Sequence, residues 1–134
     1  MNISFSEILL WLYVVNLGTT FGAGLFETRI ILPQWFAKSP ETGFQVNRKS
    51  MIETDTGRKF WGFVTTVPLT LLTIANLVLA IQANEPRHTW WLASSIIILV
   101  ERLGTFFFFI PTAIKLMSSD SLSPSRINTL VVLW

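Results

Sequence analysis

The chain of 134 residues contains no cysteine and only one histidine, His88. Without cysteine there is no disulfide framework, no thiol redox motif, no thiolate-bound zinc or iron–sulfur site, and no cysteine nucleophile. A single histidine cannot supply both axial ligands of a haem, and its place beside Arg87 in a short turn favours an interfacial residue over a metal ligand. We therefore expect no metal site and no bound cofactor.

Charge is scarce as well. Asp, Glu, Lys and Arg make up 13% of the residues, about half the share of an average soluble domain. Eight of these charges fall between Pro33 and Lys59, which leaves long stretches elsewhere with none. No basic stripe is present for nucleic acid, so nucleic acid is excluded as a partner. With 51% hydrophobic residues and a mean hydropathy of +0.53, residues 1–134 are predicted to form a single membrane-embedded domain.

Three apolar segments, about residues 8–32, 60–84 and 89–114, are long enough to cross a membrane. About 20 residues, at about 1.5 Å each, span a hydrocarbon core of about 30 Å. No lysine or arginine precedes the first segment, so a retained helix is favoured over a cleaved signal peptide. Pro68 interrupts the second segment, and a kink or a neighbouring helix must satisfy the carbonyl that it frees. The expected fold is an all-α transmembrane helical bundle.

The connections between these segments differ in length. Residues 85–88 form a short turn, so the second and third spans are predicted to be antiparallel neighbours. Residues 118–126 are polar and are expected to be a loop. The apolar run at residues 127–134 is too short to cross the membrane. A chain truncated inside a fourth helix is favoured here over a segment that only dips into the interface.

The linker at residues 33–59 is long enough for structure of its own. Ser39 and Pro40 match the preferred first residues of a helix. The apolar residues that would share one face of such a helix are Phe44, Met51 and Ile52. We therefore predict a short amphipathic helix on the membrane surface between the first two spans.

Basic residues are distributed unequally among the loops. The 33–59 loop has five and the 115–126 loop has two, whereas the 85–88 turn has one and the N-terminal tail has none. Cytoplasmic loops carry an excess of Lys and Arg. Both longer loops are therefore predicted to be cytoplasmic and the N-terminus to face outward. The expected location is the cytoplasmic membrane of a bacterium.

Four ionisable residues lie inside the spans: Glu27 and Arg29 in the first, and Glu101 and Arg102 in the third. A charge at mid-membrane costs about 2.5–3.5 kcal/mol, so such residues usually face the bundle interior and pair. Adjacent residues point about 100° apart on a helix, so we expect Glu101 and Arg102 each to need a partner on another helix. The first helix is the natural source of that partner.

Further polar residues extend this set into a predicted buried polar cluster. Its members are Asn16, Thr20, Glu27, Arg29, Glu101, Arg102 and Thr105. An ion pair that fixes how the helices meet and a group that lines a pocket or transfers protons are equally favoured interpretations. The catalytic candidates under the second interpretation are Glu27, Glu101 and Arg102.

Gly18 and Gly22 form a GxxxG pattern, which permits close helix approach. Packing inside the bundle is favoured over a homo-oligomer interface through these glycines. The run Phe106 to Phe109 is expected to face lipid and core rather than to line an aromatic pocket.

Several short motifs keep a common order and spacing along the chain. They lie at residues 22–27, 32–35, 57–63, 101–106 and 109–114. Together they resemble the anthrone-oxygenase-like family of small four-helix integral membrane proteins, most of which have no known function. The resemblance implies a fourth helix that begins near Asn128. It also implies, from a few members, oxidation of anthrones to anthraquinones without a bound metal or flavin.

Two functions follow as hypotheses. The first is a cofactor-free oxygenase that acts on a lipophilic, anthrone-like aromatic, with Glu27 or Glu101 as the base that forms a carbanion. The second is a non-catalytic membrane scaffold, accessory subunit or small carrier, in which the buried charges are structural. The expected partners are the lipid bilayer and a lipophilic small molecule.

Overall fold

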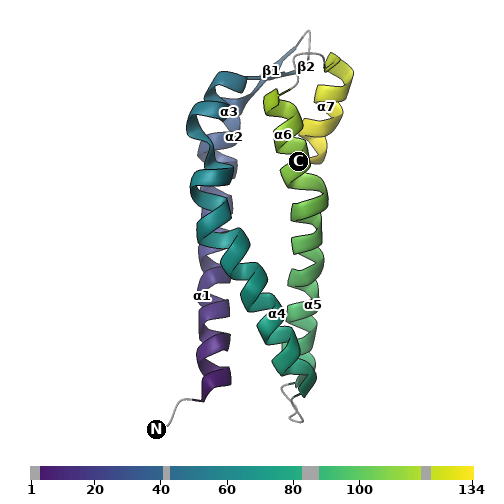
Figure 1. Ribbon diagram of the computed structural model, residues 1–134. Helices are drawn as coiled ribbons and strands as arrows, with labels where there is room; N and C mark the ends of the chain where they lie inside the picture. The colour runs from purple at the N-terminus through teal and green to yellow at the C-terminus, as the bar shows by residue number, and fades with distance from the viewer. Residues whose placement is uncertain (1–3, 41–42, 83–87, 119–121) are drawn as a thin grey trace.

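The computed structural model describes residues 4–40, 43–82, 88–118 and 122–134. Three long helices run side by side along an elongated bundle, and a hairpin and two short helices gather at one end, called here the hairpin end (Figure 1). The start of α1, at Phe5, lies at the opposite end.

The three long helices contain both α-helical and π-helical segments. In chain order these segments are α1 (Phe5–Phe26), η1 (Glu27–Ile31) and α2 (Leu32–Trp35); η2 (Gly57–Thr66) and α4 (Val67–Gln82); and α5 (His88–Gly104), η3 (Thr105–Phe109) and α6 (Ile110–Ser118). Each helix is long and apolar enough to cross a membrane, with 31, 26 and 31 residues. The three predicted segments are therefore confirmed as long apolar helices, with ends that extend or shift by a few residues.

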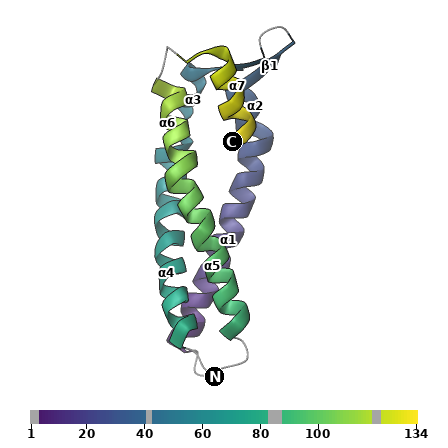
Figure 2. The same ribbon diagram turned by 90° about the vertical axis from the view of Figure 1, so that its right-hand side faces the viewer.

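The packing of the spans centres on α4, which contacts α1 on one side and α5 on the other. Figures 1 and 2 show α4 and α5 side by side and antiparallel, as the short connection between them predicts. Most of that predicted turn, residues 85–87, lies outside the described residues. At its start, α1 is capped by a reciprocal pair: Ser4 Oγ accepts from the Glu7 N–H, and Glu7 Oε2 accepts from the Ser4 N–H.

The linker between the first two spans is not the helix predicted from Ser39 and Pro40. Strands β1 (Phe36–Ser39) and β2 (Gly43–Val46) form an antiparallel hairpin, so the all-α expectation was incomplete. The helix of this linker, α3 (Arg48–Thr54), begins later, and Asn47 caps it by accepting from the Ser50 N–H.

The three apolar residues assigned to one helix face are also placed differently. Phe44 belongs to β2, Met51 is buried, and Ile52 is 58% exposed. Two features explain this: Gly43 adopts a positive φ of 79° that suits a turn, and the paired residues Phe36 and Val46 pack on the buried cluster that contains Met51. Turn and strand geometry therefore prevailed over the helix-start signal.

The last helix, α7 (Pro124–Leu133), turns back from the hairpin end and contacts β2 (Figure 2). It begins three residues before the apolar run from which it was predicted. Asn128 docks it, because its side-chain oxygen accepts the Phe44 N–H of β2 at 2.6 Å. The ring of Trp134 contacts the rings of Phe36 and Phe109, each with centroids 6.1 Å apart. These contacts join α7 to the hairpin and to the third span.

Candidate functional site

Glu27 lies on the first span, where it faces the start of the second. Its Oε1 atom accepts hydrogen bonds from Trp61 Nε1 and Thr56 Oγ1, both at 2.9 Å. The other carboxylate oxygen, Oε2, accepts no hydrogen bond from the described residues. The structure therefore holds this carboxylate by one oxygen and leaves the second one available.

The Glu27 carboxylate borders a groove between the first and second spans, called here the Glu27 groove. Its volume is about 530 Å³. The lining residues are Thr19, Ala23, Phe26, Glu27, Ile31, Thr56, Phe60 and Trp61. Three aromatic rings, one carboxylate and two threonine side chains thus share a groove that is mostly apolar. An apolar site with a few placed polar groups is the usual form of a small-molecule site.

Asn16 and Thr20, also predicted for the polar cluster, satisfy backbone groups. Asn16 Nδ2 donates to the Val64 carbonyl of the second span at 3.0 Å. Pro68 has no N–H, so the Val64 carbonyl lacks its α-helical donor, and Asn16 replaces that donor. This confirms that a neighbouring helix satisfies the freed carbonyl. Thr20 Oγ1 donates to the Asn16 carbonyl at 2.9 Å within its own helix.

Glu101 and Arg102 pair with each other rather than with the first helix. Glu101 Oε2 accepts from Arg102 Nε at 2.6 Å and lies 2.5 Å from Arg102 Nη2. The expectation that adjacent residues could not satisfy each other was wrong, because a long arginine side chain can curl back over the 100° between them. Thr105 Oγ1 completes the group and donates to Glu101 Oε1 at 3.0 Å.

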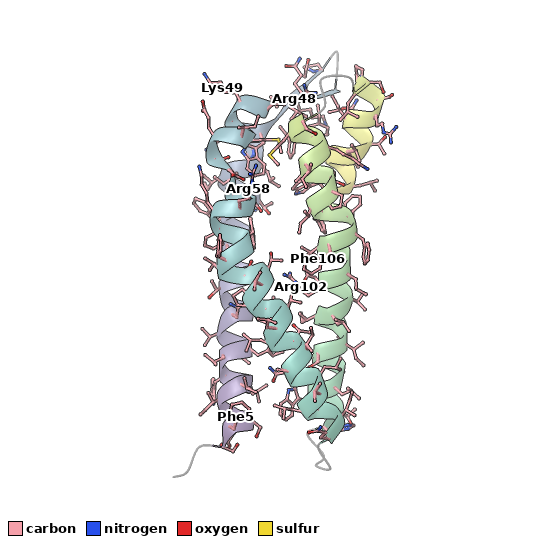
Figure 3. All side chains as sticks on the ribbon, in the orientation of Figure 1. Phe5, Arg48, Lys49, Arg58, Arg102 and Phe106 are labelled. Atoms are coloured by element: carbon pink, nitrogen blue, oxygen red, sulfur yellow. The ribbon has the colours of Figure 1, made fainter. Side chains whose placement is uncertain are left out.

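The two members of this ion pair have different surroundings. The Arg102 side chain is 6% exposed, whereas that of Glu101 is 47% exposed. Figure 3 shows Arg102 on the side of the third span that faces the second. Arg102 thus faces the interior as predicted, whereas Glu101 is exposed, so the prediction was wrong for Glu101.

The remaining predicted residue, Arg29, is exposed. The hydrogen bonds and ion pairs of the described residues do not join Glu27 to Glu101 or Arg102. The single cluster predicted from the sequence therefore separates into a Glu27 group near the hairpin end and a Glu101–Arg102–Thr105 group in the third span.

A third polar group, near the N-terminal end of the bundle, was not predicted. Asn76 is fully buried; its Oδ1 accepts from Trp91 Nε1 at 3.0 Å, and its Nδ2 donates to the Leu72 carbonyl at 2.8 Å. Tyr13, 2% exposed, donates from its hydroxyl to the Ser94 carbonyl at 3.4 Å. The sequence signal that could have predicted this group is Asn76 itself, because a polar side chain inside an apolar span needs hydrogen-bond partners from the bundle.

Gly18 and Gly22 do not pack inside the bundle as favoured from the sequence. Both are exposed, and a Cβ atom added at either position would meet nothing within 4 Å. Among the phenylalanines of η3, Phe107 is 80% exposed and Phe109 is 37% exposed, so the run is divided between the outer face and the contact with Trp134.

Within the described part of the chain, no group of three or more His, Cys, Asp or Glu side chains is placed to hold a metal ion. Comparison of this chain with family models, with curated proteins and with solved structures found no match.

Proposed function

We propose that this protein is a membrane enzyme that binds a lipophilic, anthrone-like aromatic in the Glu27 groove and oxidises it with O₂ without a cofactor. The observation that supports this proposal is the Glu27 carboxylate at an apolar, aromatic-lined groove, held by Trp61 and Thr56 through one oxygen. A positioned carboxylate with an available oxygen is suited to act as a general base.

The reaction balances with O₂ as the only co-reactant. Glu27 removes a proton from the CH₂ group between the two aryl rings, and the resulting carbanion is delocalised over both rings. The carbanion transfers one electron to O₂, and the two radicals combine to form a C–O bond. The peroxide takes the proton back from Glu27 and then loses water, which leaves a ketone. One O₂ is consumed and one water is released for each CH₂ group converted.

Glu27 is a better candidate for this base than Glu101. Both oxygens of Glu101 are engaged, one by Arg102 and the other by Thr105. Glu101 therefore has no carboxylate oxygen as available as Oε2 of Glu27. Glu27 has only neutral hydrogen-bond donors among the described residues.

The substrate reaches the groove from the bilayer. Glu27 is eight residues from the Trp35 end of a 31-residue helix, or about 12 Å along the axis. That helix is about 46 Å long, so its central third lies deep in the hydrocarbon core. Glu27 lies just outside this central third, on the side of the hairpin end. Ala23 and Thr19, one and two turns from Glu27 toward the bilayer centre, extend the groove inward. A flat apolar molecule dissolved in lipid can enter this groove laterally.

Oxygen uptake by the purified protein with anthrone tests the proposal. Glu27→Gln should lower the rate at least about 100-fold, since general base catalysis contributes about 10²–10⁴-fold. The matched control, Glu101→Gln, should retain most of the activity. A Glu27→Gln variant that consumes oxygen at the unaltered rate would contradict the assignment of Glu27.

A second candidate is a non-catalytic scaffold, accessory subunit or small carrier. It is favoured by the same two hydrogen bonds of Glu27, because they tie the first span to Trp61 of the second and to Thr56, the residue just before it. In that case anthrone would cause no oxygen uptake, and Glu27→Gln would lower the stability of the protein in detergent. The uptake measurement therefore separates the two candidates.

We also propose a membrane arrangement. In it α7 is the start of a fourth span of a four-helix bundle, α3 lies at the membrane surface, and the hairpin end is cytoplasmic in a bacterial cytoplasmic membrane. The support is the basic-residue bias toward the 33–59 and 115–126 segments. Gly18 and Gly22, where an added Cβ would meet no other described residue within 4 Å, are candidates for a contact between two copies.

A further inference from the structure

The basic residues of the chain are concentrated in two sequence segments, whose described parts lie toward the hairpin end. Residues 27–59 and 115–126 carry eight basic and five acidic residues. Three of the cations, Lys49, Arg58 and Lys59, come from α3 and from the start of η2. Figure 3 shows Lys49 and Arg58 on the same side of the molecule, toward the hairpin end.

Contacts at the C-terminal end of α3 link two of these cations to Glu53 and the third to Asp55. Lys49 Nζ lies 3.9 Å from Glu53 Oε1, and Lys59 Nζ donates to the Glu53 carbonyl at 2.8 Å. Arg58 Nε lies 3.3 Å from Asp55 Oδ2. The side chains of Lys49 and Arg58 are 85% and 86% exposed, so these surface ion pairs leave most of their N–H donors available.

Exposed apolar side chains follow Lys49, Arg58 and Lys59 along the outer face of the second span and form what is called here the apolar ridge. Phe63, Val67 and Leu71 follow Lys59 at successive four-residue steps, which places them on one side of the helix. They are 80%, 56% and 63% exposed. Cations above an apolar ridge, at the end of a membrane-spanning helix, match the headgroup and the acyl chain of a phospholipid.

We propose that this face binds an anionic phospholipid. Its phosphate lies among Lys49, Arg58 and Lys59, and one acyl chain lies along the ridge that begins at Phe63. The anionic headgroup is favoured over a zwitterionic one because the site supplies three cations against the two carboxylates of Glu53 and Asp55. The site is separate from the Glu27 groove and does not depend on the proposed reaction.

Native mass spectrometry of the full chain in detergent tests this site, with added dioleoylphosphatidylglycerol and dioleoylphosphatidylcholine as probes. The measured quantity is the ratio of their dissociation constants. A juxtamembrane cation contributes about fivefold to anionic-lipid affinity, so Arg58→Gln with Lys59→Gln should reduce the preference for phosphatidylglycerol about 20- to 30-fold. Lys38→Gln with Arg126→Gln removes the same charge elsewhere at this end and should change the ratio less than about twofold.

The ridge and the identity of the ligand have their own tests. Phe63→Ala should weaken binding of both lipids and leave their ratio unchanged, because it removes acyl-chain contact only. Inorganic phosphate added at the lipid concentration should not displace phosphatidylglycerol. Equal loss of preference in the two charge variants would overturn the site and indicate a diffuse surface potential. Full displacement by phosphate would overturn the lipid as the ligand.

Discussion

The hydrogen bond from Asn16 to Val64 makes a quantitative prediction about how Pro68 is tolerated inside a span. Asn16→Leu removes the donor that reaches the Val64 carbonyl at 3.0 Å. Hydrogen bonds between membrane helices average about 0.6 kcal/mol and reach about 1.7 kcal/mol. This one should lie in the upper half of that range, because Pro68 cannot supply an alternative donor. Asn16 Oδ1 is itself buried without a partner among the described residues, and its removal offsets part of the loss. The expected net cost is about 1 kcal/mol.

A double-mutant cycle isolates this effect. Pro68→Ala restores the N–H that can bond the Val64 carbonyl, so Asn16→Leu should cost close to nothing in that background. The expected coupling free energy is about 1 kcal/mol. The assay is unfolding of the four purified proteins by sodium dodecyl sulfate in mixed micelles, followed by circular dichroism.

Thr19→Val is the matched control for this cycle, because the Thr19 hydroxyl bonds the Val15 carbonyl of its own helix. Its cost should be the same whether or not the Pro68→Ala substitution is present. If Asn16→Leu also costs the same in both backgrounds, the Asn16 amide does not compensate for the proline, and the reasoning fails.

Three further predictions concern other parts of the molecule. Gly43→Ala should release α7 from the hairpin and cost about 1–2 kcal/mol in the same assay, because φ is 79° there and a Cβ would collide with the docking amide of Asn128. Arg102→Leu alone should unfold more easily than the double variant Glu101→Leu/Arg102→Leu, since the single change leaves a lone carboxylate in the span; equal midpoints would contradict this. Single cysteines at Ser50 and Thr89 should be labelled by an impermeant reagent from opposite sides of the membrane, and labelling of both from outside would refute the proposed orientation.

The spans could be predicted from the sequence because length and hydropathy alone determine which segments can cross a bilayer. The hairpin could not, because the local signals conflict: Ser39 and Pro40 are typical of a helix start, whereas Gly43 suits a turn. Only the pairing of Phe36 with Val46 and their packing toward Met51 decide between them. Those are tertiary contacts, which a local pattern does not contain.

The sequence could predict which residues belong to the candidate site, but not which partners they contact. The rule that ionisable residues in spans face the interior correctly identified Glu27 and Arg102 as residues of interest. It could not tell which partner each would find, because Arg102 reaches back to its own neighbour. Trp61, which donates a hydrogen bond to Glu27, is part of the 57–63 motif but was not predicted to contact Glu27. Its indole N–H inside an apolar span, which requires an acceptor, was the missed signal.

Each of the three spans contains a π-helical stretch, and all three stretches lie toward the hairpin end. A π-helical turn is an α-helix that has accommodated one extra residue. If that extra residue moves along the helix, only the residues it passes rotate, by about 100° each, while both ends of the helix stay docked. Glu27 and Thr105 are the first residues of η1 and η3, so such a shift would re-aim their side chains in place. The three spans thus have α-helical geometry in the half away from the hairpin end and carry all three π-helical stretches in the other half, which is where the Glu27 carboxylate lies.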